Sequence, residues 1–445
     1  GKGKNLNIVK EIHFPHSLGL LYSAFTYYAG FKVNSGEYKL MGLAPYGVPK
    51  YANLIKAKIV RICEDGSFHL DMSYFGYATS LTMTTNKFNK LFDGPPRQAE
   101  AVLTQRDMDI AASIQKVTEE IIVKLARGIA SETGLRNLCL AGGVALNCVA
   151  NGILTREKIF DKIWIQPASG DAGGALGAAL AAWHIHHNKD RVVSTSIDAM
   201  RGSFIGPEFT DDEIRLTLDA CGARYHAVTF NNLIGSVTEA LVAQKAIGWM
   251  QGRMEFGPRA LGGRSILADP RSPFMQKRLN LKVKYRESFR PFAPSILREC
   301  VHDWFEHDAD SPYMLLVADL KKNKRLVMTA SQKSLFGIDQ LNVSRSHVPA
   351  ITHVDYSARL QTVHSATNPR YHALIKNFFE VTGCPIVVNT SFNIRGEPIV
   401  CNPEDAFKCF MGTELDILAI GNYLLFKEEQ DGDLATDLTD RYVLD

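Results

Sequence analysis

A regular spacing of apolar residues predicts one long amphipathic helix from Thr104 to about Glu132. The apolar positions in this stretch recur every three or four residues and therefore fall on one helical face. They are Ile110, Ile114, Val117, Ile121 and Leu125. Gly134 follows, and glycine commonly ends a helix because it takes up the left-handed conformation without strain. An apolar and aromatic run over residues 20–28 predicts an earlier, shorter helix.

After Gly134 the pattern changes to short apolar runs that end in glycine-rich turns. Residues 138–140 predict a buried strand that turns sharply at residues 141–147, and residues 163–165 predict a second strand. A loop over residues 167–171 and a helix of small residues follow. Two such units in succession favour a nucleotide-binding α/β domain, because they present backbone N–H groups and helix N-termini to phosphates. Alternatively, the glycines only allow a helix to pack closely on a sheet.

Asp171 is placed at the carboxyl end of the second predicted strand, where α/β sheets keep their ligands. It could bind a metal, hold a ribose hydroxyl, or cap the helix that follows. Lys39 lies between Gly36 and Gly42 and is a candidate for reaching a phosphate, although a solvated loop lysine is an equally good interpretation.

The 445 residues predict two domains, because one ordinary core does not grow to this size. We predict a first domain over residues 1–190, a linker over 191–205, a second domain over 206–430 and a flexible tail over 431–445. Within the second domain, residues 210–213 match a helix capping box. Residues 246–250 and 385–389 predict strands that lead into polar loops.

Two pairs of polar residues in the second domain suggest a site for a phosphate-bearing small molecule. Lys284 and Arg286 form a Lys-x-Arg pair, and Ser391 and Asn393 form a Ser-x-Asn pair. If each segment is extended, alternation of side chains places both members of a pair on one face. Two cations and two neutral hydrogen-bonding groups, brought together by folding, suit a phosphate.

Arginines cluster in the neighbouring segments, where glycine and proline shape the loops. Arg259 and Arg264 belong to a glycine-rich loop, and Arg290 precedes Pro291. Guanidinium groups bind phosphate oxygens in pairs and stay charged. The alternative is a surface network of ion pairs with Glu255 and Glu287.

Composition restricts the class of ligand. The net charge is only +3 and charged residues make up 22% of the chain, which does not suit a nucleic-acid or membrane partner. Eight cysteines without a Cys-x-x-Cys pair indicate a reduced, cytoplasmic protein. No apolar run reaches membrane-spanning length. The locally clustered arginines therefore point to a small anionic ligand.

Six segments together resemble the NodU/CmcH family of O-carbamoyltransferases, in the order that the family has them. They are residues 17–19, 39–44, 141–147, 257–262, 290–295 and 389–393. The resemblance implies an α/β protein with a partial actin-like (ASKHA) lobe over residues 1–190, similar to the tRNA threonylcarbamoyl transferase. It implies a YrdC-like domain with a twisted mixed sheet over residues 206–430, where Lys284, Arg286, Ser391 and Asn393 match the signature.

The resemblance implies an ATP-dependent reaction in two steps. Carbamoyl phosphate and ATP form carbamoyl adenylate in the second domain, and the carbamoyl group then moves to a hydroxyl of a small natural product. The implied catalytic residues are Arg259, Lys284, Arg286 and Arg290. Residues implied to bind the nucleotide or the carbamoyl group are Lys39, Gly142, Gly143, Asn147, Arg264, Ser391 and Asn393. Mg²⁺ would accompany ATP, and Asp171 would bind Fe²⁺ or another divalent metal in the first domain.

The family also has an upstream phosphate loop and a His-His-x-x-x-His metal motif that are absent from these 445 residues. We therefore expect this chain to form carbamoyl adenylate but not to transfer the carbamoyl group. Two alternatives stay open: a threonylcarbamoyl-type tRNA-modifying enzyme, and a nucleotide-binding regulator without catalysis. A homodimer is possible, and the acceptor is not indicated by the sequence.

Overall fold

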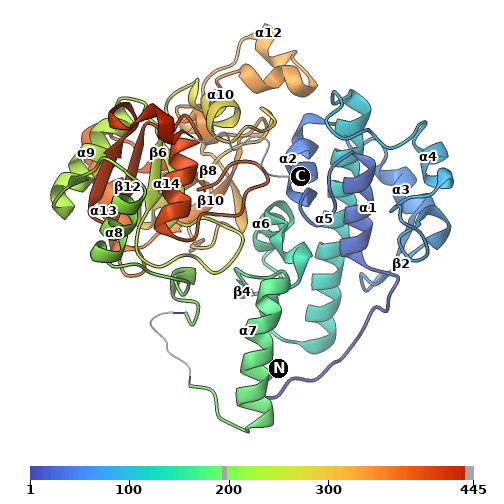
Figure 1. The fold of residues 1–445 in the computed structure, drawn as a ribbon. Coiled ribbons are helices and arrows are strands. Elements are labelled where there is room, and N and C mark those ends of the chain that lie inside the picture. The colour runs from blue at the N-terminus through green and yellow to red at the C-terminus, as the bar shows by residue number, and fades with distance from the viewer. Residues whose placement is uncertain (193–197, 436–445) are drawn as a thin grey trace. The chain divides into compact units, whose positions relative to one another are not determined.

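A computed structural model describes residues 1–192 and 198–435 (Figure 1). These residues form two compact units, which are considered one at a time. The first contains residues 1–192 together with residues 330–342, and the second contains residues 198–329 and 343–435. Residues 330–342 thus group with the first unit, although they lie inside the range predicted for the second domain. Parts of the predicted linker and tail, residues 193–197 and 436–445, lie outside the described residues.

The second unit is built on one nine-stranded mixed sheet, so the predicted α/β class with a mixed sheet is confirmed. The strand order is β5-β13-β12-β6-β7-β11-β8-β10-β9. Pairs β10–β8 and β12–β6 are parallel and the other neighbours are antiparallel. The strands are β5 (His226–Ala227), β6 (Ile247–Met250), β7 (Arg264–Ala268), β8 (Ala293–Leu297), β9 (Leu316–Asp319), β10 (Ser357–Val363), β11 (Ile386–Ser391), β12 (Ile417–Ile420) and β13 (Tyr423–Phe426). The predicted strands at 246–250 and 385–389 correspond to β6 and β11.

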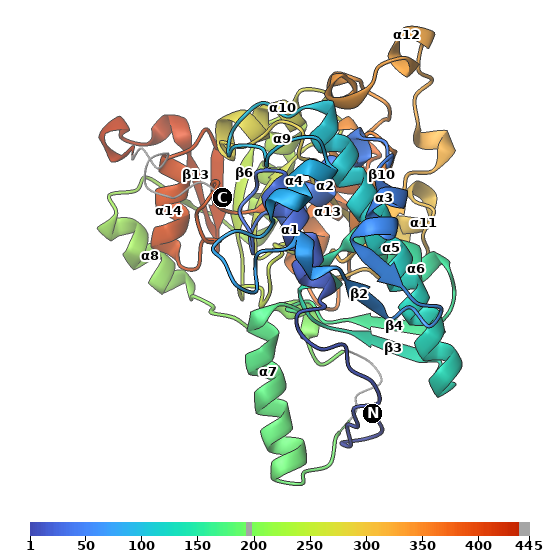
Figure 2. The same cartoon turned by 90° about the vertical axis from the view of Figure 1, so that its right-hand side faces the viewer.

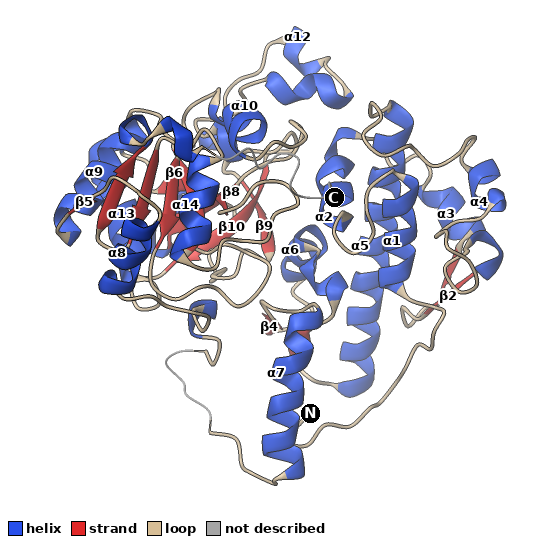
Figure 3. Cartoon of the chain, viewed as in Figure 1, coloured by secondary structure: helices blue, strands red, loops and turns tan. Residues whose placement is uncertain are grey.

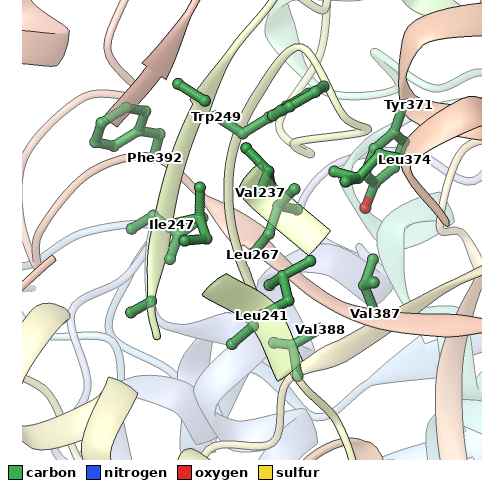
Figure 4. Close-up of a cluster of buried hydrophobic side chains, with 14 of the residues drawn as sticks. Val237, Leu241, Ile247, Trp249, Leu267, Tyr371, Leu374, Val387, Val388 and Phe392 are labelled. Atoms are coloured by element: carbon green, nitrogen blue, oxygen red, sulfur yellow. The ribbon is translucent and has the colours of Figure 1, made fainter. Parts of the chain in front are cut away.

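Helices cover this sheet and enclose a continuous apolar core (Figure 4). Val237 and Leu241 of α9 and Leu374 of α13 are fully buried together with Ile247 and Leu267 from the central strands. Every residue of β6, β7, β8 and β12 is buried. The helices of this unit are α8 (Asp211–Ala220), α9 (Phe230–Val242), α10 (Met275–Arg278), α11 (Val301–Trp304), α13 (Pro369–Thr382) and α14 (Pro403–Met411).

Helix α8 begins with the predicted capping box. The Thr210 hydroxyl accepts a hydrogen bond from the Glu213 backbone N–H at 3.3 Å, and the Glu213 carboxylate accepts one from the Thr210 N–H at 2.7 Å. Two of the backbone donors that a helix N-terminus leaves without an intrahelical partner are satisfied in this way.

The first unit is organised around the long helix α5 (Gln105–Thr133), which confirms the predicted amphipathic helix. Thr104 caps its start, and Gly134 ends it with a φ of +65°. The other helices that pack in this unit are α1 (Leu18–Tyr28), α2 (Glu37–Leu43), α3 (Ala52–Lys58), α4 (Asn86–Leu91) and α6 (Cys148–Arg156). Residues 51–100 thus contain α3 and α4 beside the hairpin of β1 (Val60–Ile62) and β2 (Phe68–Leu70).

The two predicted strand–turn–helix units of the first unit are confirmed, but the first strand is not buried as predicted, because residues 137–140 alternate between exposed and half-buried. Strands β3 (Asn137–Leu140) and β4 (Lys162–Ile165) pair in parallel and lie side by side in Figure 2. The helix after β4 is α7 (Asp171–Ala181), and none of its described side chains is buried. Figure 3 shows how small this sheet is beside the sheet of the second unit.

Residues 330–342 contain α12 (Ala330–Lys333) and a 3₁₀ turn (Gly337–Asn342). Gly337 approaches α5 so closely that a Cβ atom there would lie 2.7 Å from Oε1 of Gln105. Its φ of +57° also favours glycine. Among the described residues, no helix combines the length and the hydrophobicity that crossing a bilayer requires.

Candidate functional site

The Lys284–Arg286 segment is not extended, so that part of the sequence prediction is wrong. A π-helical turn (Leu279–Val283) runs into Lys284, which still has helical backbone angles. Tyr285 then adopts a left-handed conformation with a φ of +47°. Lys284 and Arg286 therefore lie on a tight turn. The backbone torsions of this turn set the directions of their side chains, and the alternation of side chains along a strand does not apply there.

Lys284 nevertheless converges with the Ser-x-Asn pair, as the sequence predicted. Its side chain is buried, and Nζ lies 2.8 Å from the Ser391 carbonyl oxygen and 3.2 Å from Ser391 Oγ. It also lies 2.7 Å from the Asn393 carbonyl oxygen and 2.6 Å from Asn393 Oδ1. Burial, together with the nearby Arg286 and Arg290 charges, holds the pKa of Lys284 well below its usual 10.5.

Strand β11 supplies the other half of the site. Ser391 is its last residue, and Ser391 Oγ donates to Asn393 Oδ1 at 2.6 Å. The Asn393 amide nitrogen donates to the Glu397 carbonyl oxygen at 2.6 Å. The Arg395 N–H donates to the Lys284 carbonyl oxygen at 3.1 Å and ties the two segments together. Segments more than 100 residues apart in the sequence thus form one hydrogen-bonded cluster.

Three arginines surround Lys284. Arg286 donates from Nε to Asn280 Oδ1 at 2.7 Å and lies over the Phe292 ring at 4.7 Å. Arg290 and Arg395 both pair with the Glu287 carboxylate, each at 3.4 Å. Glu287 thus forms the ion pairs of the alternative interpretation, but the three side chains are largely buried rather than on the surface.

Arg395 and Glu287 are site residues that the sequence reasoning did not select. Arg395 is largely buried, with a side-chain exposure of 6%. The available signal was its position shortly after the Ser-x-Asn pair, in a turn with Gly396. Glu287 was considered only as part of a surface network, whereas its carboxylate joins two arginines beside Lys284.

The glycine-rich arginine loop joins β6 to β7. Arg264 begins β7 with a fully buried side chain, and its guanidinium donates to carbonyl oxygens. Its partners include Gly252 at 3.0 Å, Gly263 at 3.1 Å and Pro207 at 3.3 Å. These contacts give Arg264 a structural role in holding the loop, and its predicted contact with a cofactor stays a prediction. Arg259, half-buried, lies farther along the same loop.

In the first unit, the two glycine-containing turns lie next to each other. The Gly142 N–H donates to the Ser169 carbonyl oxygen at 2.8 Å, which links the loops that follow β3 and β4. Gly142 has a φ of +93°, and a Cβ atom at Gly142 or Gly143 would meet nothing within 4 Å. Asn147 is buried, caps α6 through Ala150 N–H at 3.1 Å and exchanges hydrogen bonds with the Gln115 amide. No neighbouring atom thus crowds the backbone at Gly142 and Gly143, whereas the Asn147 amide is hydrogen-bonded within the unit.

Lys39 and Asp171 stand in opposite environments. Lys39 is fully buried in α2, with Nζ 5.8 Å from the centre of the Phe31 ring. Asp171 is the exposed first residue of α7. Over residues 1–192 and 198–435, no three His, Cys, Asp or Glu side chains come together in an arrangement that could hold a metal. The described donors therefore do not fit a metal at Asp171, because a firmly held catalytic metal needs about three protein ligands.

Family models for the two halves of carbamoyltransferases match this chain. The model described as the carbamoyltransferase N-terminus matches residues 1–180, and that of the carbamoyltransferase C-terminus matches residues 238–427. The second match includes the Lys284, Ser391 and Arg259 segments, and the first includes the Gly142 turn and Asp171.

Individual relatives cover nearly the whole chain. An uncharacterized protein of Synechocystis sp. is 60% identical over 97% of this chain and 70% of its own length. Nodulation protein NolO of Bradyrhizobium diazoefficiens is 36% identical over 96% of this chain and 72% of its own length. Nodulation protein NolNO of Sinorhizobium fredii is also 36% identical, over 96% of this chain and 58% of its own length. The chain thus spans roughly three fifths to seven tenths of these relatives.

Proposed function

Because the chain belongs to the carbamoyltransferase family, we propose that its second unit forms carbamoyl adenylate from carbamoyl phosphate and ATP. The observation that carries this proposal is the convergence of Lys284, Arg286, Arg290 and Arg395 beside the Ser391–Asn393 turn. Lys284 and three arginines meet there, and the carboxylates of Glu287 and Glu397 lie close to the same cluster. Such a cluster suits an anion with several negative oxygens.

The proposed reaction begins with carbamoyl phosphate and water, which give carbamate and inorganic phosphate. A carbamate oxygen attacks the α-phosphorus of ATP, the bond from that phosphorus to the β-phosphate oxygen breaks, and pyrophosphate leaves. Negative charge accumulates on phosphate oxygens during this displacement, so fixed cations lower its barrier. Arg259, Arg286 and Arg290 supply guanidinium forks, and Mg²⁺ enters with ATP as part of the substrate.

Lys284 contributes through its enclosure. Its amine is surrounded by neutral oxygen acceptors and by arginines that disfavour a further positive charge, which keeps its pKa low. An arriving phosphate oxygen would favour the ammonium form and compete with Ser391 Oγ or Asn393 Oδ1 for its protons. The ammonium group would then bind the substrate, and its attraction to the phosphate oxygens would grow as negative charge develops on them.

In the second step, a hydroxyl oxygen of the acceptor attacks the carbamoyl carbon, AMP leaves, and the hydroxyl proton is lost. This step would use the first unit, where a nucleotide phosphate meets no side chain at the Gly142 and Gly143 backbone, but we expect this chain alone to complete only the first step. No part of it is routed through a metal, because the described donors near Asp171 do not form a metal site. The acceptor is proposed to be a small molecule with a hydroxyl group.

Pyrophosphate release from ATP, measured with and without carbamoyl phosphate, tests the proposal. We expect release that depends on carbamoyl phosphate and that proceeds without ADP formation. A protein that binds ATP without releasing pyrophosphate would be a nucleotide-binding regulator instead. Pyrophosphate release that depends on threonine and bicarbonate would indicate the tRNA-modifying alternative, for which the net charge of +3 offers little support.

A further inference from the structure

Buried side chains hold the loop between β6 and β7 in place through hydrogen bonds to its backbone. The loop carries Arg259 and ends where β7 begins at Arg264, and the Gly263 carbonyl oxygen accepts from the Gln251 backbone N–H at 2.9 Å. Backbone N–H and C=O groups that are buried need partners. At residues 260–264 many of these partners are side chains. Some belong to the loop and its flanking strands, and Gln361 and Asn389 come from strands more than 90 residues away in the sequence.

One carboxylate satisfies the donors of this loop. Oε1 of Glu255 accepts from the N–H groups of Leu261 at 2.6 Å, Gly263 at 2.7 Å and Arg264 at 3.3 Å. Glu255 is 6% exposed, and these three donors are all backbone N–H groups. The Gly262 N–H, between two of these groups, donates to Ser265 Oγ at 3.0 Å. A buried carboxylate that collects several N–H groups is a strong, directional anchor.

Three buried side chains satisfy the acceptors of the same loop in succession. Asn389 of β11 donates to the Ala260 carbonyl oxygen at 3.1 Å, and Gln361 of β10 donates to that of Leu261 at 2.8 Å. Trp249 Nε1 of β6 donates to that of Gly262 at 2.9 Å. Asn389 also donates to Gln361 Oε1 at 2.9 Å, so the two amides hold each other in place.

Close packing leaves room only for glycine at position 262 of the loop. Gly262 has a φ of +103°, and a Cβ atom there would lie 2.2 Å from the ring of Tyr371. Donors, acceptors and shape thus all specify one conformation for residues 260–264. Because the residues of a preorganised site must be held within a fraction of an ångström by their supporting shell, this network has the properties of such a shell.

We propose that Glu255, supported by Gln361 and Asn389, is a positioning residue that fixes the loop so that Arg259 meets the reacting phosphate. The inference rests on the proposed function, because it assigns to Arg259 a contact with the phosphate. Glu255 itself does not contact the substrate: it acts through the loop. Removing its carboxylate leaves three loop N–H groups without their acceptor, and the position of Arg259 becomes less defined.

A double-mutant cycle on carbamoyl-phosphate-dependent pyrophosphate release tests this, with Arg259→Ala, Glu255→Ala and the double variant. We expect Arg259→Ala to lower kcat/KM at least about tenfold, as a lost charge-assisted contact does. Glu255→Ala should lower it about tenfold with a larger effect on kcat than on KM. The double variant should lie within about twofold of Arg259→Ala, because both changes remove the same contact. Independent effects would multiply to about a hundredfold.

Two further variants separate positioning from general stability. Leu241→Ala removes a fully buried side chain of α9 and should lower the Tm while leaving kcat within about twofold at a temperature where all proteins are folded. Glu255→Gln keeps an amide oxygen that can accept the same N–H groups, and should restore activity to within about threefold of the wild type. If Glu255→Ala does not fold, Gln361→Ala takes its place in the cycle.

The outcomes distinguish the two proposals. No pyrophosphate release by the wild-type protein would overturn the proposed function. Activity in the wild type together with full activity in Glu255→Ala, or with multiplicative loss in the double variant, would overturn the positioning role alone. Full activity in Arg259→Ala would overturn it as well, because Glu255 would then have no group to position.

Discussion

The nine-stranded sheet of the second unit and the β3–β4 sheet of the first unit differ greatly in size and in the burial of their strands. The unit that contains the Lys284 cluster has a sheet of nine strands, and the central strands β6, β7 and β12 are buried along their whole length. Two parallel strands carry the Gly142 turn and Asp171, and among the described residues no other strand pairs with them. Parallel strands are normally buried on both faces. Here residues of β3 alternate between exposed and half-buried.

The two regions also differ in how completely their candidate site residues are held in place. The Lys284 cluster has side chains converging from several segments, with defined partners at hydrogen-bonding distance. The predicted residues of the first unit have open backbone at Gly142 and Gly143, and an exposed carboxylate at Asp171. The first partial reaction should therefore be separable from the second. The predictions below compare matched positions in the two regions.

The largest expected effect concerns stability. Gly262 and Gly142 both have φ near +100°, so alanine strains the backbone at either position. Only at Gly262 would the new Cβ collide with a packed side chain, the Tyr371 ring at 2.2 Å. We expect Gly262→Ala to lower the free energy of unfolding by about 3–4 kcal/mol and Gly142→Ala by about 1 kcal/mol. Urea denaturation measures both, and equal losses would show that the two loops are equally packed.

The next effect concerns catalysis. Lys284→Ala removes the amine that Ser391 and Asn393 enclose and that an arriving phosphate would contact, and should lower carbamoyl-phosphate-dependent pyrophosphate release at least about tenfold, equivalent to about 1.5–3 kcal/mol. Lys282→Ala is the control two residues earlier, where the side chain is exposed and pairs with Glu414. Its activity should stay within about twofold of the wild type. A similar loss of pyrophosphate release in both variants would contradict a specific catalytic role for Lys284.

The buried lysine also predicts a dependence of stability on pH. Burial lowers the pKa of Lys284 below its usual 10.5, so between the two values the unfolded chain binds one proton more than the folded protein. Stability therefore rises with pH in that window, by up to about 1.4 kcal/mol per pH unit. Lys427, whose pKa burial lowers to about 8, contributes with the same sign in all variants.

In Lys284→Met this contribution of residue 284 is lost. The stability of the wild type relative to the variant should increase as the pH rises toward 10.5, and denaturation curves collected from about pH 7 to pH 10 measure it. Lys282→Met, at an exposed position, should show no such trend. A stability difference for Lys284→Met that is constant with pH would contradict the lowered pKa.

A smaller effect is expected at Glu287. Its carboxylate pairs with Arg290 and Arg395 and so occupies guanidinium groups that an incoming phosphate would use. Glu287→Gln removes that competing charge and should tighten inhibition by pyrophosphate about two- to fivefold. Glu414→Gln, which releases the exposed Lys282, should leave the inhibition constant unchanged. Weaker inhibition by pyrophosphate in Glu287→Gln would mean that Glu287 orders the arginines rather than competing for them.

The smallest effect is expected in the first unit. Asp171→Asn changes an exposed residue that lies in no described cluster of metal ligands. Pyrophosphate release should stay within about twofold of the wild type, and the Tm should change by less than about 1 °C. A loss of pyrophosphate release as large as that of Lys284→Ala would show that the two regions do not act separately.

The sequence predicted the elements whose signals are local. The apolar spacing of α5 and its glycine end, the capping box of α8, and the strands β3, β4, β6 and β11 each follow from neighbouring residues. The convergence of Lys284 with Ser391 was also anticipated, although the extended conformation behind that argument is wrong. The left-handed Tyr285 turns the chain there, and a period-two pattern contains no information about such a turn.

The residues that were missed or placed differently depend on tertiary contacts. Arg395 joins the cluster because its backbone bonds to Lys284, more than 100 residues earlier. Arg264 was selected for its charge, but folding surrounds its guanidinium with carbonyl oxygens. Lys39 lies between glycines in the sequence, yet α2 buries it. Burial of a cation depends on what packs around it, and a single sequence does not state this.

The most direct test of the account is a rapidly quenched reaction with [¹⁴C]carbamoyl phosphate and [α-³²P]ATP. We expect one short-lived product that carries both labels, formed together with one equivalent of pyrophosphate and absent with Lys284→Ala. Carbamoyl transfer to an acceptor without any doubly labelled product, or cleavage of ATP to ADP, would contradict it.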